Sequence, residues 1–292
     1  MANAGLVYAL AAALAVVHAG CSPAPADDQP AATAPQQTDA ATQQSPGGPL
    51  PDAAPGPIAS PASAGGSSLT FEDASLSFVA QFPDAPAGDP VIAGLRRDAE
   101  SYLAQAKANA RGDFDAAKKA GHEPRPWDVR IRWTYSAKAG DIVSLIGEAS
   151  EYTGGAHPSQ RFDAHIARAN GDRIAFGDML IAKRSPSPAL VIAICEALKA
   201  AKIAKIRTDT ILDEPIVCVG PNSNAKTEDA KLALAPSNDA DKFGGIYAYY
   251  EPYAVGAYAE GPYILTVQQE IFAEDLRPEF KALFAGEAPQ PN

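Results

Sequence analysis

Two segments of the sequence carry side chains that could bind a ligand. The first is Gly154-Gly155-Ala156-His157, where adjacent glycines allow positive φ angles and a close approach of the backbone to another molecule. This segment either presents His157 and its own amides to a ligand, or is a structural loop in which His157 bonds to the backbone. The second segment is rich in tyrosine, whose flat ring and polar hydroxyl suit recognition of sugars or proteins. Its members are Tyr247, Tyr249, Tyr250, Tyr253, Tyr258 and Tyr263.

The tyrosines divide into two groups by their spacing. Tyr247 and Tyr249 alternate along a predicted strand and share one face of a sheet, where core packing is the simpler role. Tyr253 and Tyr258 lie instead in a segment bounded by Pro and Gly, which predicts a loop at the rim of a binding site. The predicted ligand-binding residues are therefore Gly154, Gly155, His157, Tyr253 and Tyr258.

Common catalytic and metal-binding motifs are missing from the sequence. It has no GxSxG or Walker motif, and no pair of aspartates combined with HxxxH, the set that a deacetylase catalytic domain needs. His157 and His165 are eight residues apart and belong to no HxxxH or HExxH run, whereas a zinc site needs about three such ligands. We therefore predict no catalytic residue, no metal and no cofactor. The alternative is an enzyme acting on peptidoglycan through His157 with Glu148 or Glu151.

The charge of the chain is distributed unevenly. It has 292 residues and a formal net charge of −11, from 24 basic and 35 acidic side chains. No Lys or Arg precedes Arg96, so the first 95 residues carry eight of the eleven net negative charges. Nucleic-acid binding requires clustered cations, and this balance therefore predicts no nucleic-acid partner.

The N-terminus has the pattern of an export signal. Leu6 to Val17 is an apolar run of 12 residues, too short for a spanning helix, which needs about 20. Ala19-Gly20-Cys21 then resembles a bacterial lipobox, although His18 replaces the usual aliphatic residue and no basic residue precedes the run. We predict a signal peptide over 1–20 and lipidation of Cys21, which would anchor the chain to the membrane. Ordinary cleavage near Ala19 is the alternative.

The residues after the signal predict a tether and a compartment. Ser22 after the cysteine is the context that sends lipoproteins to the outer membrane, so we expect a periplasmic, lipid-anchored protein. Residues 21–67 are rich in Pro and Ala and predict a disordered linker. In an exported chain, the remaining pair Cys195 and Cys218 favours a disulfide bond.

The patterns beyond the linker predict an α+β fold with antiparallel sheets and packed helices. Asp89-Pro90 begins a long amphipathic helix that ends near Gly121, and Ser185-Pro186 or Ser187-Pro188 begins a second one. A short third helix is expected over 278–284. Alternating apolar residues predict strands over 69–71, 76–82, 129–135, 142–152, 161–167, 216–219 and 245–250.

Four stretches of the sequence also resemble a known bacterial family. They are Tyr152-Thr-Gly-Gly-Ala-His157, Phe162-Asp163, the run from Asn170 to Leu180, and the run from Tyr250 to Pro262. They resemble the extracytoplasmic two-domain module found outside the catalytic domain of PdaC-type peptidoglycan deacetylases and in the ectodomain of RsiV-type anti-sigma factors. The resemblance implies a PdaC-like domain over 68–150, an RsiV-like domain over 151–285 and a tail over 286–292. Because the RsiV ectodomain binds lysozyme, it also implies a partner of that kind.

These observations predict a binding or sensor module of the cell envelope without catalytic activity. Its expected partners are peptidoglycan or another cell-envelope glycan, or an exported protein such as lysozyme. A protective protein that inhibits lysozyme is a third possibility, and differs from the first only in its partner.

Overall fold

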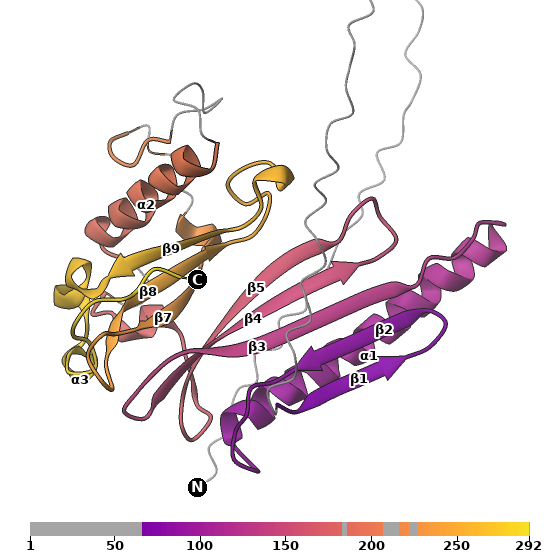
Figure 1. Cartoon of the computed structure of the whole chain (residues 1–292), viewed down its shortest axis with the longest axis horizontal. Helices are drawn as coiled ribbons and strands as arrows, with labels where there is room; N and C mark the ends of the chain where they lie inside the picture. Colours follow the sequence, from indigo (N-terminus) through magenta and orange to yellow (C-terminus); the bar gives the residue numbers. More distant parts are fainter. Residues whose placement is uncertain (1–65, 183–185, 207–215, 222, 224–226, 292) are drawn as a thin grey trace, which may run out of the picture. The chain divides into compact units, whose positions relative to one another are not determined.

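A computed structural model describes residues 66–182, 186–206, 216–221, 223 and 227–291. Over these residues the protein has the predicted α+β fold, with two sheets and few helices (Figure 1). The predicted signal peptide (1–20), the lipidation site Cys21 and nearly all of the predicted linker (21–67) lie outside the described residues. Within the described part, no helix has the length and apolar character needed to cross a membrane.

The larger sheet has six strands in the order β1-β2-β3-β4-β5-β6 (Figure 1). All neighbouring strands are antiparallel except β2 and β3, which run parallel. A parallel pair needs a crossover connection, and α1 (Pro90–Lys119) provides it. The strands are β1 (Ser68–Glu72), β2 (Leu76–Gln81), β3 (Trp127–Ala139), β4 (Ile142–Tyr152), β5 (Ser159–Arg168) and β6 (Arg173–Ile174).

The start and the buried face of α1 follow from its sequence. The carboxylate of Asp89 accepts hydrogen bonds from the amides of Val91 and Ile92 at 2.9 and 3.0 Å, and Pro90 has no amide hydrogen to satisfy. Apolar residues at helical spacing then pack against the sheet and form one core with it. The buried residues of the helix are Val91, Ile92, Leu95, Ala99, Leu103, Ala106 and Ala110.

The smaller sheet has the order β7-β8-β9 and packs against α2 (Pro188–Ile206). Its central strand β8 is buried along its whole length. Ser187 begins α2, since its hydroxyl accepts a hydrogen bond from the amide of Leu190 at 3.3 Å. The strands are β7 (Lys231–Pro236), β8 (Phe243–Tyr250) and β9 (Tyr263–Gln268). Short helices are η1 (Phe176–Met179), η2 (Thr227–Asp229), η3 (Tyr258–Glu260), η4 (Gln269–Ile271), η5 (Ala273–Asp275) and α3 (Pro278–Lys281).

Strand β7 joins the two sheets through serine hydroxyls. Ser136 on β3 donates to the carbonyl of Leu234 at 2.7 Å, and Ser144 on β4 accepts from the amide of the same residue at 2.9 Å. The predicted boundary between residues 150 and 151 falls inside β4, and β5 continues the same sheet beyond it. The division into domains over 68–150 and 151–285, with a tail over 286–292, stays a prediction.

One expected strand is absent from the described residues, and a strand occurs where none was expected. Residues 216–219 form a loop, in which Cys218 is bonded to the preceding helix instead of pairing with a strand. Strand β7 was not anticipated, because alanine has a low intrinsic preference for strands and Ala233 and Ala235 make up much of it. Burial in the core between the sheets overrides that preference, since both alanines are fully buried.

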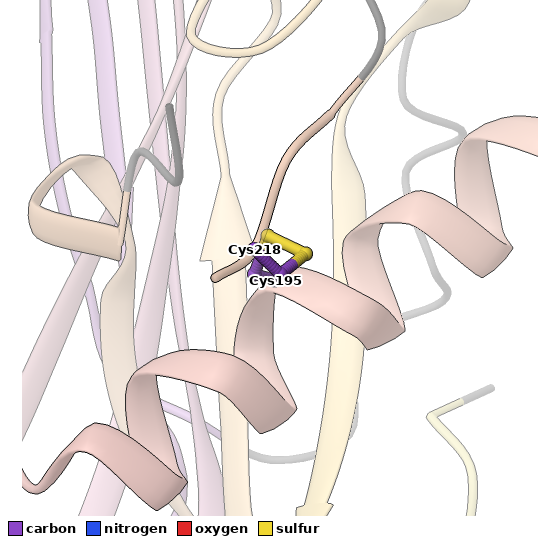
Figure 2. The surroundings of a disulfide bond; sticks show 2 residues. All are labelled: Cys195 and Cys218. Carbon is purple, nitrogen blue, oxygen red and sulfur yellow. A yellow bond between two sulfur atoms is a disulfide. The ribbon is translucent and has the colours of Figure 1, made fainter. Parts of the chain in front are cut away.

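The predicted disulfide bond between Cys195 and Cys218 is confirmed (Figure 2). Cys195 lies within α2, and Cys218 lies in the segment that precedes β7, with a Cα–Cα distance of 5.6 Å. Both side chains are buried. The bond therefore links α2 to a segment without secondary structure of its own.

Candidate functional site

Three of the predicted binding residues meet in one aromatic cluster, which we define as His157, Tyr253 and Tyr258. His157 lies in the loop between β4 and β5, whereas both tyrosines lie in the loop between β8 and β9. The imidazole of His157 stacks on the ring of Tyr258, with a centroid distance of 4.0 Å and an interplanar angle of 21°. The ring of Tyr253 lies 6.2 Å from His157 and 5.4 Å from Tyr258.

Hydrogen bonds fix the polar atoms of this aromatic cluster. The hydroxyl of Tyr258 donates to the carbonyl of Pro158 at 2.9 Å, which ties the two loops together. Nδ1 of His157 lies 3.2 Å from the same carbonyl, which can only accept, so Nδ1 carries the proton. In the tautomer that has its proton on Nδ1, Nε2 can accept a hydrogen bond from the hydroxyl of Tyr253 at 3.4 Å. Together these contacts orient the imidazole.

Tyr253 is an exposed member of the aromatic cluster. Its side chain is 64% exposed, and its backbone φ is +72°. A residue other than glycine rarely adopts such a φ, and the strain persists only where neighbouring structure maintains it. The fold therefore holds a large apolar side chain in solvent by means of an unfavourable backbone conformation, which is typical of a binding residue.

The two predicted glycines have different roles in the first loop. Gly154 has a φ of +92°, where any other residue would be strained. Gly155 has no positive φ, and a Cβ atom added to it would meet open space. The expected conformational freedom is therefore required at Gly154 and not at Gly155.

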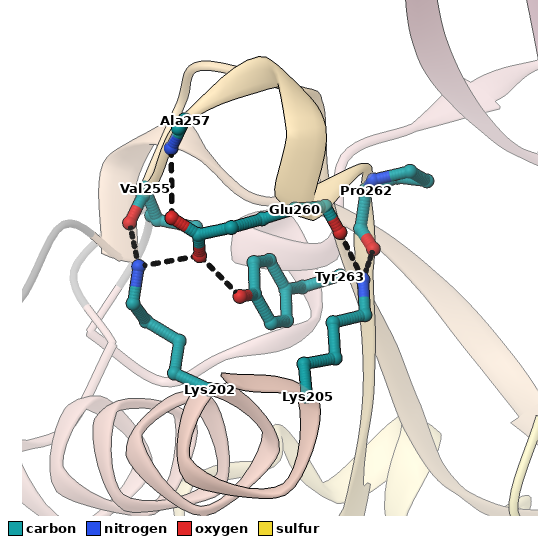
Figure 3. A network of polar contacts seen from close by, with 7 residues as sticks. All are labelled: Lys202, Lys205, Val255, Ala257, Glu260, Pro262 and Tyr263. Carbon is teal, nitrogen blue, oxygen red and sulfur yellow. Dashed lines mark hydrogen bonds and ion pairs between the residues drawn. The ribbon is translucent and has the colours of Figure 1, made fainter. Parts of the chain in front are cut away.

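A polar network on α2 supports the loop that carries the two tyrosines (Figure 3). The side chain of Lys202 is 8% exposed, and its ammonium pairs with the carboxylate of Glu260 at 2.9 Å and donates to the carbonyl of Val255. Glu260 also accepts from the amide of Ala257 at 2.8 Å and from the hydroxyl of Tyr263. Because Glu260 closes the short helix that begins at Tyr258, the network positions this tyrosine.

The pKa of Glu260 reflects these contacts. Burial alone would raise the pKa of this carboxyl, but hydrogen bonds from Tyr263 and Lys202 outweigh burial and lower the pKa below its usual value. Lys205 lies one helical turn beyond Lys202 and donates to the carbonyl of Glu260 at 2.8 Å. The sequence analysis did not predict this polar network. Two lysines spaced three apart in an apolar helix are nevertheless a pattern that indicates charges with acidic partners.

The other groups considered for chemistry do not join the aromatic cluster. His165 is buried on β5, where its ring meets that of Trp133 edge to face at 6.2 Å. Glu148 pairs with Arg132 at 2.6 Å, and Glu151 pairs with Arg161 at 2.8 Å. In the part of the chain that the structure describes, no three side chains form a group able to hold a metal ion.

His165 gives the protein a predicted pH dependence. Burial lowers the pKa of this histidine below 6.5, Arg173 adds to the effect, and Asp163 and Asp98 partly oppose it. The unfolded chain then binds a proton more readily, so this contribution to stability is complete above about pH 6.5 and is lost as the pH falls toward the folded pKa. We expect a lower denaturant midpoint at about pH 5.5 than at about pH 7.5. His165→Leu should reduce this difference and His122→Gln, at an exposed position, should preserve it; an unchanged difference in His165→Leu would contradict the assignment.

Comparison with known proteins found similarity only among solved structures. No family model matches the chain, and no curated protein matches it. A member of the DUF3298 family from Bacteroides fragilis is similar at 14% identity and a TM-score of 0.44, covering 74% of this chain and 92% of its own. A DUF3298 family protein from Pseudomonas aeruginosa is similar at 16% identity and a TM-score of 0.44, covering 76% of this chain and 95% of its own. At these values the comparison assigns no ligand and no activity.

Proposed function

We propose that this chain is a binding module of the bacterial cell envelope, without catalytic activity, that recognises peptidoglycan through the aromatic cluster. The observation that carries the proposal is that His157, Tyr253 and Tyr258 come from two distant loops and stack into one group with an exposed tyrosine. Stacked rings with polar edges suit sugars, which present apolar ring faces and hydroxyl groups. A glycan strand is therefore the envelope ligand that this surface fits best.

The location in the envelope is proposed from the sequence. The apolar run before Ala19-Gly20-Cys21 and the Pro-rich segment after it suit export, lipidation of Cys21 and a tether. The chain would then stand in the periplasm, attached to the outer membrane by lipid. In this compartment the aromatic cluster would face peptidoglycan and any exported protein that acts on it.

The resemblance to the PdaC-type and RsiV-type modules supports the same setting. Two of its four stretches, Tyr152 to His157 and Tyr250 to Pro262, contain the loops that form the aromatic cluster. Because the RsiV ectodomain binds lysozyme, an exported protein of that kind is the alternative ligand. The same purified chain can be tested against both partners.

Binding to purified peptidoglycan tests the proposal. We expect the full chain to sediment with peptidoglycan sacculi, and His157→Ala combined with Tyr253→Ala to weaken binding about tenfold, because aromatic residues dominate such contacts. The control is Tyr135→Ala, which removes another exposed tyrosine from β3 near the opposite end of β4. Undiminished binding by the double variant would overturn the proposed site. Binding to lysozyme on a sensor surface, with none to sacculi, would favour the exported protein instead.

A further inference from the structure

A pocket lies on the face of the larger sheet that α1 partly covers. It has a volume of about 510 Å³ and opens between α1 on one side and strands β3, β4 and β5 on the other. This volume is in the usual range for small-molecule sites, roughly 300–1,000 Å³. The pocket contains no member of the aromatic cluster, so its role is independent of the function proposed above.

Small residues leave the space for this pocket. Gly147 lines the pocket and lets the indole ring of Trp133 pack directly against the strand, because a Cβ atom there would come within 2.9 Å of the ring. Ala149 on the same strand and Ala99 on α1 fill little of the pocket's volume. Since Trp133 and Tyr102 also line the pocket, its interior offers aromatic surface to an apolar group.

Two charged residues of opposite sign line the pocket without partners. The side chains of Asp98 on α1 and Lys231 on β7 have no hydrogen bond or ion pair with any residue that the structure describes, and they do not pair with each other. Within the described residues, the carboxylate of Asp163 on β5 has only a long contact of 3.6 Å with Arg173, and both of those side chains are more than half exposed. A contact of this kind contributes little to stability, so Asp163 is also available to a ligand.

The other charged groups of the pocket are already engaged. Arg161 pairs with Glu151 at 2.8 Å and donates to the hydroxyl of Tyr102 at 3.2 Å. Glu251 accepts a hydrogen bond from the amide of Phe162 at 3.1 Å, at the edge of β5. The groups left for recognition are therefore two carboxylates and one ammonium.

The two carboxylates face the same region from different elements. Asp98 and Asp163 both act on the imidazole of His165 and raise its pKa, against the effect of burial. His165 shares a face of β5 with Asp163, because residues two apart on a strand point the same way. Its Nδ1 is buried and has no hydrogen-bond partner within the described ranges, which leaves a donor or acceptor beside this region.

We propose that this pocket binds a zwitterionic ligand, a free amino acid or a short peptide. Its ammonium group would pair with Asp98 and Asp163, its carboxylate would pair with Lys231, and an apolar side chain would lie against Tyr102 and Trp133. A neutral sugar would leave both signs of charge unpaired. A ligand with one sign of charge would pair only with the residues of the opposite sign. A zwitterion satisfies both.

Fluorescence of Trp133 can report binding to the full chain. The protein has two tryptophans, so Trp127→Phe leaves Trp133 as the only one. The probe is alanyl-phenylalanyl-alanine, compared with its N-acetylated form, which lacks the ammonium, and its C-terminal amide, which lacks the carboxylate. We expect a saturable change in fluorescence with the free peptide, and binding at least about tenfold weaker for each blocked form.

Charge variants assign each end of the ligand to its residue. In Asp98→Asn, the affinities for the free and the N-acetylated peptide should differ less than they do in the parent. In Lys231→Gln, the affinities for the free and the amidated peptide should differ less than they do in the parent. Glu100→Gln, at an exposed position on the same helix, and His157→Ala, in the aromatic cluster, should bind as the parent does. The absence of a saturable signal, equal binding of blocked and free peptides, or preferential binding of N-acetylglucosamine would overturn the proposal.

Discussion

Replacing Glu260 by glutamine is expected to lower the free energy of unfolding by about 3 kcal/mol. Among the described residues, Glu260 carries the only charge paired with Lys202, whose side chain is 8% exposed, so the change leaves this buried ammonium without that counter-ion. Breaking a buried ion pair from one side typically costs about 3–5 kcal/mol, because desolvation of the remaining charge is no longer compensated. Chemical denaturation of the variant and the parent at about pH 7 measures the loss.

A double-mutant cycle separates the ion pair from its surroundings. Lys202→Met combined with Glu260→Leu should cost less than the sum of the two single changes, because neither charge is left alone in the core. Glu274→Gln is the matched control, since Glu274 pairs with Lys281 at 3.1 Å but is 96% exposed. Exposed pairs contribute about 0–1 kcal/mol. A cost for Glu260→Gln as small as that of Glu274→Gln would show that the buried pair does not stabilise the fold.

The same pair links stability to the proposed function. Glu260 and Lys202 hold the loop that carries Tyr253 and Tyr258, through the carbonyl of Val255 and the amide of Ala257. A loop released from α2 would no longer maintain the positive φ of Tyr253, because strained conformations relax when the structure around them loosens. The aromatic cluster therefore depends on contacts in the interior as well as on its own rings.

Local patterns predicted most of the elements of the fold. Asp89 and Pro90 define the start of α1, because capping and the first turn depend only on neighbouring residues. The hairpin of β3 and β4 follows from alternation on either side of Gly140, which has a φ of +55°. The parallel pairing of β2 with β3 could not be predicted in this way, because it depends on where α1 returns the chain.

The candidate site could likewise be predicted only in part from the sequence. The residue types at His157, Tyr253 and Tyr258 indicated binding, but their contact joins positions about a hundred apart in the chain. The ion pair of Lys202 with Glu260 spans 58 residues and depends on how α2 packs against β9. Asp98 and Lys231 resemble ordinary surface charges in the sequence, and only the fold places them in one pocket. The chemistry of these side chains could therefore be predicted from the sequence. Which of them lie close together could be known only from the tertiary structure.

Removal of the disulfide bond is expected to lower the stability of the protein by about 3 kcal/mol. Cys195 and Cys218 close a loop with a sequence separation of 23, and the entropy that a loop of this length removes from the unfolded chain corresponds to about 3 kcal/mol. Thermal unfolding of Cys195→Ser/Cys218→Ser should show a transition roughly 6–12 °C lower for a folded body of this size. The reduced parent should unfold at the same temperature as the double variant. Cys21→Ser removes the third cysteine and serves as the control, with no expected change. If the double variant unfolds with the parent, or if mass analysis finds two free thiols at these positions in the exported protein, the bond does not stabilise the fold.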